Sequence, residues 1–292
     1  MKFVRQMCAL VFALFMASFS LQAAERTKAI AFMEVTGFDV SLRSMRVSAA
    51  DAPAMLGLDA EDFGLSWSRL ADEIFEPTQI EQDALAILER ALQDDVLLHV
   101  SAFYASDLGQ RLVDAENESH FTDDTKKREL GHKLAMSLEN RGSPQPQYFR
   151  DMANDIGSIE SSIRSYREVQ VRFLMAAMSA GLMQRQLDEP DLREILGLQD
   201  TKIKSSMMEN MIVSNAYTYR KFSDLEVEQY RDALGTKEMR EVYALMNAIH
   251  FTLMAERYEQ MALKMADLHP SQSLEFHLTL PTSREINRQI GF

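Results

Sequence analysis

Residues Val96–Arg111 read VLLHVSAFYASDLGQR and predict the end of one helix followed at once by the start of another. Leu97, Val100 and Tyr104 are separated by three and four residues, which places them on one apolar face of a helix. Ser106 suits the N-cap of the second helix, because its hydroxyl can accept a hydrogen bond from the backbone of the first turn. The segment therefore indicates a junction between two helices.

Gly109 follows three residues after that cap and has no side chain, so a neighbouring helix can approach it closely. This packing explanation makes Phe103, Tyr104, Ser106 and Gly109 a structural signature, and we predict no catalytic, cofactor-binding or metal-binding residue among them. The same segment contains an aromatic pair followed by Ser-x-x-Gly and a basic residue. This pattern resembles the signature of a bacterial family of exported all-helical proteins of unknown function. The resemblance implies a helical periplasmic protein and supplies no established catalytic residues.

The composition favours helices throughout the chain. Only 11 Gly and 7 Pro occur among 292 residues, of which 46% are hydrophobic and 26% are charged. Few turn residues combined with regularly spaced apolar residues predict long helices. We therefore predict an all-α protein, a multi-helix bundle.

The first residues have the pattern of a secretory signal peptide. Two cations, Lys2 and Arg5, precede an apolar run at 7–21, and two small residues follow at 23–24. A retained membrane anchor is the alternative, but the run is shorter than the roughly 20 apolar residues that span a bilayer. We therefore predict that residues 1–24 are cleaved and that the mature protein is periplasmic, with no transmembrane span.

Export also determines the redox chemistry and the charge of the mature chain. Cys8, the only cysteine, lies within the predicted signal peptide, so the mature chain forms no disulfide and is stabilised by packing. Loss of the two signal-peptide cations takes the formal net charge from −13 to −15. Because so acidic a surface repels phosphate backbones, nucleic acid is not expected as a partner.

The chain divides most clearly at Asn140–Pro146, where Gly, Ser and two Pro occur together. We predict an N-terminal helical half at 25–140 and a C-terminal helical half at 141–268, packed as one unit. In the second half a capping-box pattern at Ser223–Glu226 precedes helices that repeat the plan of the Val96–Arg111 junction. The bundle is therefore predicted to consist of two weakly related halves.

The alignment of this weak repeat has two solutions. Without gaps, Tyr104 corresponds to Leu234 and Gly109 corresponds to Met239. In the second register, Gly109 corresponds to Gly235. The sequence leaves both registers open.

Two further segments carry distinct patterns. From Phe149 to Ala180, apolar residues recur at steps of three and four, which predicts one long buried helix rather than a coiled-coil seam between two copies. At Ser273–Leu280 apolar and polar residues alternate, which is a strand pattern. Since a lone strand has no partner in a helical fold, we predict that 269–292 form an extended tail in a helix groove. Addition of this strand to a partner's sheet is the alternative.

The sequence contains none of the common motifs for zinc-protease, serine-hydrolase, phosphate-loop or paired-cysteine chemistry. The best candidate for a metal site combines His120 with five carboxylates, at Asp114, Glu116, Glu118, Asp123 and Asp124. Its spacing matches no calcium loop, so a solvated acidic face is the favoured interpretation. Met175 with Met178, or Met208 with Met211, are candidate thioether ligands for cuprous ion, although core packing explains these residues better. No cofactor is predicted.

Together these observations predict a non-catalytic role. The favoured hypothesis is a periplasmic interaction or envelope-maintenance protein whose partner is another envelope protein. The alternative is a periplasmic carrier of a small apolar ligand or lipid, clasped between the two halves by methionine-rich helices. An enzyme of an unrecognised type is the third possibility.

Overall fold

The computed structural model describes residues 25–56, 65–157, 159–183 and 186–268. These residues form an all-α bundle, as predicted. After a first helix at 25–36, the elements are α2 (Phe38–Ser48), the 3-10 helix η1 (Ala49–Leu56), α3 (Leu65–Ile74), α4 (Pro77–Ala91), α5 (Asp94–Tyr104), α6 (Asp107–Phe121), α7 (Asp124–Asn140), α8 (Gln145–Asp155), α9 (Ile159–Ser179), α10 (Glu189–Gly197), α11 (Asp200–Thr218), α12 (Asp224–Leu234) and α13 (Lys237–Leu268). The predicted signal peptide and C-terminal tail lie outside the described residues.

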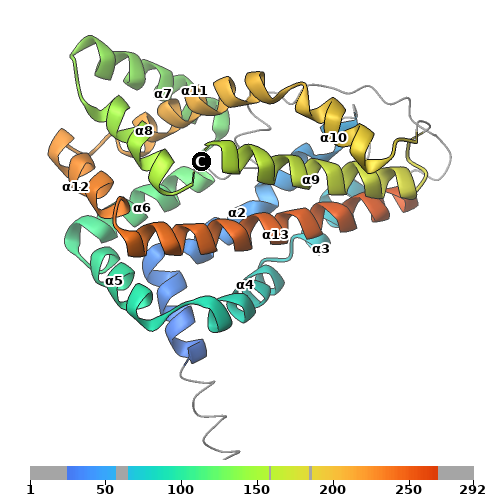
Figure 1. Cartoon of the computed structure of the whole chain (residues 1–292), viewed down its shortest axis with the longest axis horizontal. Helices are drawn as coiled ribbons and strands as arrows, with labels where there is room; N and C mark the ends of the chain where they lie inside the picture. Colours follow the sequence, from blue (N-terminus) through green and yellow to red (C-terminus); the bar gives the residue numbers. More distant parts are fainter. Residues whose placement is uncertain (1–24, 57–64, 158, 184–185, 269–292) are drawn as a thin grey trace, which may run out of the picture.

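The 32-residue helix α13 is the central element of the bundle. Figure 1 shows it running across the molecule with α9 alongside, and it also contacts α3, α4 and α5. Apolar residues are buried around most of its circumference, which is typical of a helix enclosed on several sides. None of the described helices is long and apolar enough to cross a membrane.

One buried apolar core contains residues from both sides of the predicted boundary at 140/141. Tyr258 of α13 is fully buried at its centre. Its ring packs edge-on against Phe75, at 5.7 Å between centroids, and against Phe173, at 5.9 Å. Phe75 belongs to the first predicted half, whereas Phe173 and Tyr258 belong to the second. The two-part division itself stays a prediction.

The prediction of one continuous helix from Phe149 to Ala180 is wrong. The chain breaks between α8 and α9 at Gly157, whose φ of 141° is disfavoured for other residues. Asn247 of α13 donates a hydrogen bond of 2.6 Å to the carbonyl of Ile156 and so binds the break to the central helix. The apolar spacing continues across the break, and periodicity alone therefore does not reveal it.

The structure decides the register of the internal repeat. Helices α5 and α12 both contain 11 residues and are both followed by two residues before the next helix. Ser106 accepts a hydrogen bond of 3.1 Å from the backbone N–H of Gly109, and Thr236 accepts one of 3.4 Å from that of Met239. The gapless register is therefore correct, and the register that aligns Gly109 with Gly235 is wrong.

Side-chain caps fix several helix ends where the sequence predicts them. Ser223 and Glu226 form the predicted capping box at the start of α12. Asp123 caps α7 by accepting from the backbone N–H of Lys126 at 3.0 Å. These caps set where α7 and α12 begin, and both helices contribute residues to the cavity described next.

Candidate functional site

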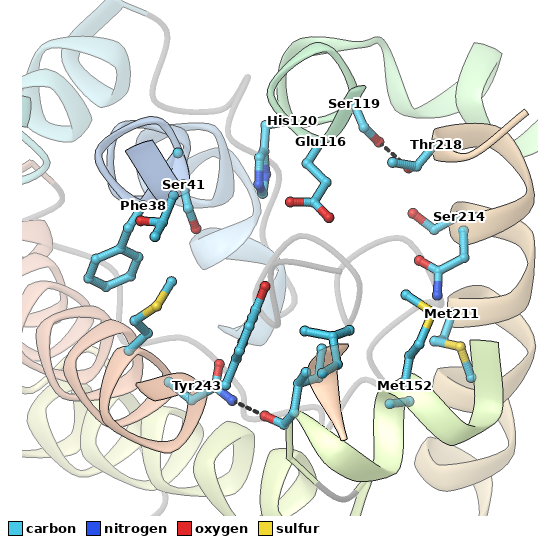
Figure 2. A pocket seen from close by; sticks show the side chains of 18 of the residues that line it. Phe38, Ser41, Glu116, Ser119, His120, Met152, Met211, Ser214, Thr218 and Tyr243 are labelled. Atoms are coloured by element: carbon cyan, nitrogen blue, oxygen red, sulfur yellow. Dashed lines mark hydrogen bonds between the residues drawn. The ribbon is translucent and has the colours of Figure 1, made fainter. Parts of the chain in front are cut away.

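A partly open cavity of about 170 Å³ lies among the first helix and α2, α6, α7, α8, α9, α11, α12 and α13. It is therefore lined by both predicted halves of the chain. Many of the described residues that line it have hydrogen-bonding side chains, among them Ser41, Glu116, Asn117, His120, Asn215 and Tyr243. Figure 2 shows Glu116 and His120 from α6, and Tyr243 from α13, directed into this space.

Glu116 is the carboxylate of the cavity. Its Oε1 accepts two hydrogen bonds, from the hydroxyl of Tyr219 at 2.7 Å and from that of Tyr230 at 2.9 Å. Among the residues that the structure describes, none donates to Oε2. Burial raises the pKa of the Glu116 carboxyl, while the hydrogen bonds from the two tyrosines act in the opposite direction. The side chain is thus held in place through one oxygen and offers the other to the cavity.

Three tyrosine hydroxyls form a cluster beside this carboxylate. The hydroxyl of Tyr104 lies 2.5 Å from that of Tyr243 and 3.1 Å from that of Tyr230, and those of Tyr230 and Tyr243 are 3.2 Å apart. The bond from Tyr230 to Glu116 brings the number of oxygen–oxygen contacts made by these three tyrosines to four. The three hydroxyls have only three protons, so one of the four contacts has no hydrogen between its oxygens. The Tyr243 hydroxyl, which lines the cavity, can consequently serve as donor or as acceptor. Burial raises the pKa of all three phenols.

Two histidines complete the polar wall. His120 lies one turn after Glu116 on α6, and His250 lies on α13. Burial lowers the pKa of each to about 4, assisted by the charge of Lys127 for His120 and by His120 for His250. Both imidazoles are therefore neutral near pH 7. The Nε2 atom of His250 is buried, and none of the described residues forms a hydrogen bond with it.

The charges at the cavity are unbalanced. Of the described residues that line it, only Glu116 and Lys127 carry a formal charge at neutral pH. Lys127 lies 3.8 Å from a carboxylate oxygen of Asp124 and 3.4 Å from the carbonyl oxygen of Ser119. Within the described part of the chain, Glu116 has no ion-pair partner. Its negative charge is met only by hydroxyl groups.

The four residues of the predicted structural signature have separate roles. Tyr104 belongs to the hydroxyl cluster, and the ring of Phe103 stacks on that of Tyr230 with centroids 5.9 Å apart. Ser106 caps α6, as predicted. A Cβ on Gly109 would lie against the Phe103 carbonyl and 2.6 Å from the Cα of Tyr104, so this glycine permits α6 to cross the end of α5.

The acidic segment around His120 does not form a metal site in the described residues, where no three potential ligands of a metal ion come together. Glu118 pairs with Arg220 at 2.6 Å, and Asp123 is a helix cap. The interpretation of this segment as a solvated face is wrong for Glu116, which points into the cavity. A signal for this was present, because Glu116 and His120 follow the buried Leu112 at helical spacing.

Sequence reasoning missed the residues that the second half contributes, namely Tyr219, Tyr230, Tyr243 and His250. Each occurs singly on an apolar helix face, where it is indistinguishable from an ordinary core residue. Of the methionines considered as copper ligands, Met178 is buried in the main core, and Met211 lines the cavity. Their burial agrees with the packing role expected from the sequence.

These observations define the class of the protein: it is an all-α bundle with a polar cavity. Comparison with known proteins adds one finding: residues 78–136 match a family model described as an uncharacterised protein conserved in bacteria, DUF2059. The matched segment begins in α4, includes Tyr104, Glu116 and His120, and ends in α7. The signature at 103–111 lies within it but is not singled out by the match. No curated protein and no solved structure matches the chain.

Proposed function

We propose that this is an exported, periplasmic binding protein that holds a small polar molecule in the cavity between its two halves. The observation that carries the proposal is the second carboxylate oxygen of Glu116, which faces the cavity without a donor among the described residues. Two hydroxyl donors to Oε1 satisfy only one side of this carboxylate, so a ligand that supplies a donor to Oε2 stabilises the folded protein. The signal-peptide pattern of residues 1–24 supports the export part of the proposal.

The size and lining of the cavity define the kind of molecule. A cavity of about 150 Å³ accommodates benzene, so the 170 Å³ here suits a molecule of about six to eight non-hydrogen atoms. Such a space is too small for a lipid chain. Its polar wall favours a polar ligand over the apolar ligand or lipid considered from the sequence. The envelope-interaction hypothesis rests on helical surface alone, and the cavity is the more specific feature.

The protonation states of the tyrosines and histidines favour binding over acid–base catalysis by these groups. An effective general acid or base has a pKa near the working pH. Here burial raises the pKa of the tyrosines and lowers that of His120 and His250 to about 4. These groups keep one protonation state around neutral pH and therefore serve as fixed hydrogen-bonding groups.

Native mass spectrometry of the protein purified from its own host tests the proposal. We expect a bound small molecule in the unmodified protein and its loss in Ser214→Met, which fills the cavity from α11. Ser137→Met is the matched control, because Ser137 is exposed on α7 away from the cavity. A second assay measures melting temperature against amines, polyols, amino acids and dicarboxylates of up to about eight non-hydrogen atoms. Absence of both a retained mass and any thermal shift would refute the proposed function.

A further inference from the structure

We infer that the molecule bound in this cavity is a small organic cation, whose protonated amine pairs with the Oε2 atom of Glu116. The inference rests on the proposed function and specifies the chemical class of its ligand. Three observations support the inference: the geometry around Glu116, the charges of the cavity and the aromatic residues in the cavity wall.

The tyrosines hold Glu116 as an acceptor. Tyr219 and Tyr230 both donate to Oε1 and so oppose the effect of burial, which is the larger effect and raises the pKa of this carboxyl. A cation at Oε2 would favour the ionised carboxylate further. Oε2 is left for a donor from the cavity. An ammonium group is the best complement, because a hydrogen bond between two charged groups is stronger than one between neutral groups.

The charges of the site lead to the same ligand class. Burying an ionised carboxylate without a cation is unfavourable, and Lys127, the one cation among the described residues of the wall, is already close to Asp124. The histidines supply no positive charge near neutral pH. A ligand cation would therefore neutralise Glu116, whereas an anionic ligand would be repelled by it.

The aromatic wall also suits a cation. Tyr219, Tyr230, Tyr243 and Phe251 all line the cavity. A ring that turns a face to the cavity attracts an ammonium group, and this attraction increases when the cation is removed from water, although one face of Tyr230 is already covered by Phe103. The Tyr243 hydroxyl and the side chain of Asn215 provide further polar groups for the remaining N–H donors or for a second polar end of the ligand.

Isothermal titration calorimetry of the purified protein tests this inference with matched pairs of probes. The amines are ethylamine, butylamine and putrescine, and their neutral counterparts are ethanol, butanol and 1,4-butanediol; succinate is the anionic probe. We expect at least one amine to bind at least about tenfold more tightly than its alcohol, with no binding of succinate. The tenfold difference corresponds to loss of one charge-assisted contact.

The variant Glu116→Gln keeps the size of the side chain and an oxygen that accepts from the tyrosines. It is expected to lose the preference for the amine and to bind amine and alcohol equally. Glu118→Gln, on the same helix but paired with Arg220 outside the cavity, is the control and should bind like the unmodified protein. The probe pairs are measured on the unmodified protein as well, so the test does not depend on the folding of the variant.

The two proposals fail in different ways. Equal or tighter binding of the alcohols, or of succinate, overturns the cation inference and leaves a polar-ligand protein. An amine preference that persists in Glu116→Gln also overturns it, because the cation is then held elsewhere. If no probe binds and no molecule is retained from the host, the proposed function itself is refuted.

Discussion

Gly109 shows how a single residue permits the crossing of two helices. The atoms that would meet its Cβ are the backbone atoms of Phe103 and Tyr104, which cannot move aside as a flexible side chain can. We therefore expect Gly109→Ala to lower the free energy of unfolding by about 1–3 kcal/mol, the usual cost of overpacking. Urea denaturation measures this change. Gly197→Ala is the control, since nothing lies within 4 Å of a Cβ there, and it should be neutral or slightly stabilising.

His250 gives the stability a defined pH dependence. Its pKa is about 4 in the folded protein and 6.5 in the unfolded chain, so between these values the unfolded chain binds more protons. The free energy of unfolding keeps its full value with respect to His250 above pH 6.5. It decreases as the pH falls toward 4, by up to about 3 kcal/mol. His120 acts in the same pH window. Urea denaturation at several pH values should show a flatter profile for His250→Gln; identical profiles would contradict the assignment.

At the scale of elements, local patterns in the sequence predict much of the structure. Helix faces follow from apolar spacing, and the caps at Ser106 and Ser223 follow from short-range hydrogen bonding. The same spacing misled at Gly157, because Met152, Ile156 and Ile159 keep their intervals across the break. It also left the repeat in two registers, since apolar residues every three or four positions align equally well when shifted by one turn.

The break between α8 and α9 is predicted to depend on Gly157. Its φ of 141° is unfavourable for a residue with a side chain, and a Cβ would lie 3.0 Å from the Nδ2 atom of Asn247. We expect Gly157→Ala to cost about 1–3 kcal/mol of unfolding free energy. Differential scanning calorimetry can compare it with Gly197→Ala. Equal melting temperatures for the two variants would show that the break tolerates an ordinary residue.

At the scale of the whole molecule, the cavity could not be predicted from the sequence. Its tyrosine hydroxyls come from Tyr104, Tyr230 and Tyr243, and the first is separated from the other two by 126 and 139 positions. Tyr104 and Tyr230 are each buried among apolar residues of their own helix, and only tertiary packing brings the hydroxyls together. The site therefore depends on the two predicted halves remaining in contact.

This dependence leads to a test of the two-part organisation. Trp67, the only tryptophan, is buried in α3 of the first predicted half, so its fluorescence reports the unfolding of that half. Phe149 is fully buried in α8 of the second half, and Phe149→Ala should cost about 3–5 kcal/mol. Because one core joins the halves, we expect the Trp67 fluorescence transition and the circular-dichroism transition to move together. A Trp67 transition that stays in place while the circular-dichroism transition shifts would show that the halves unfold separately.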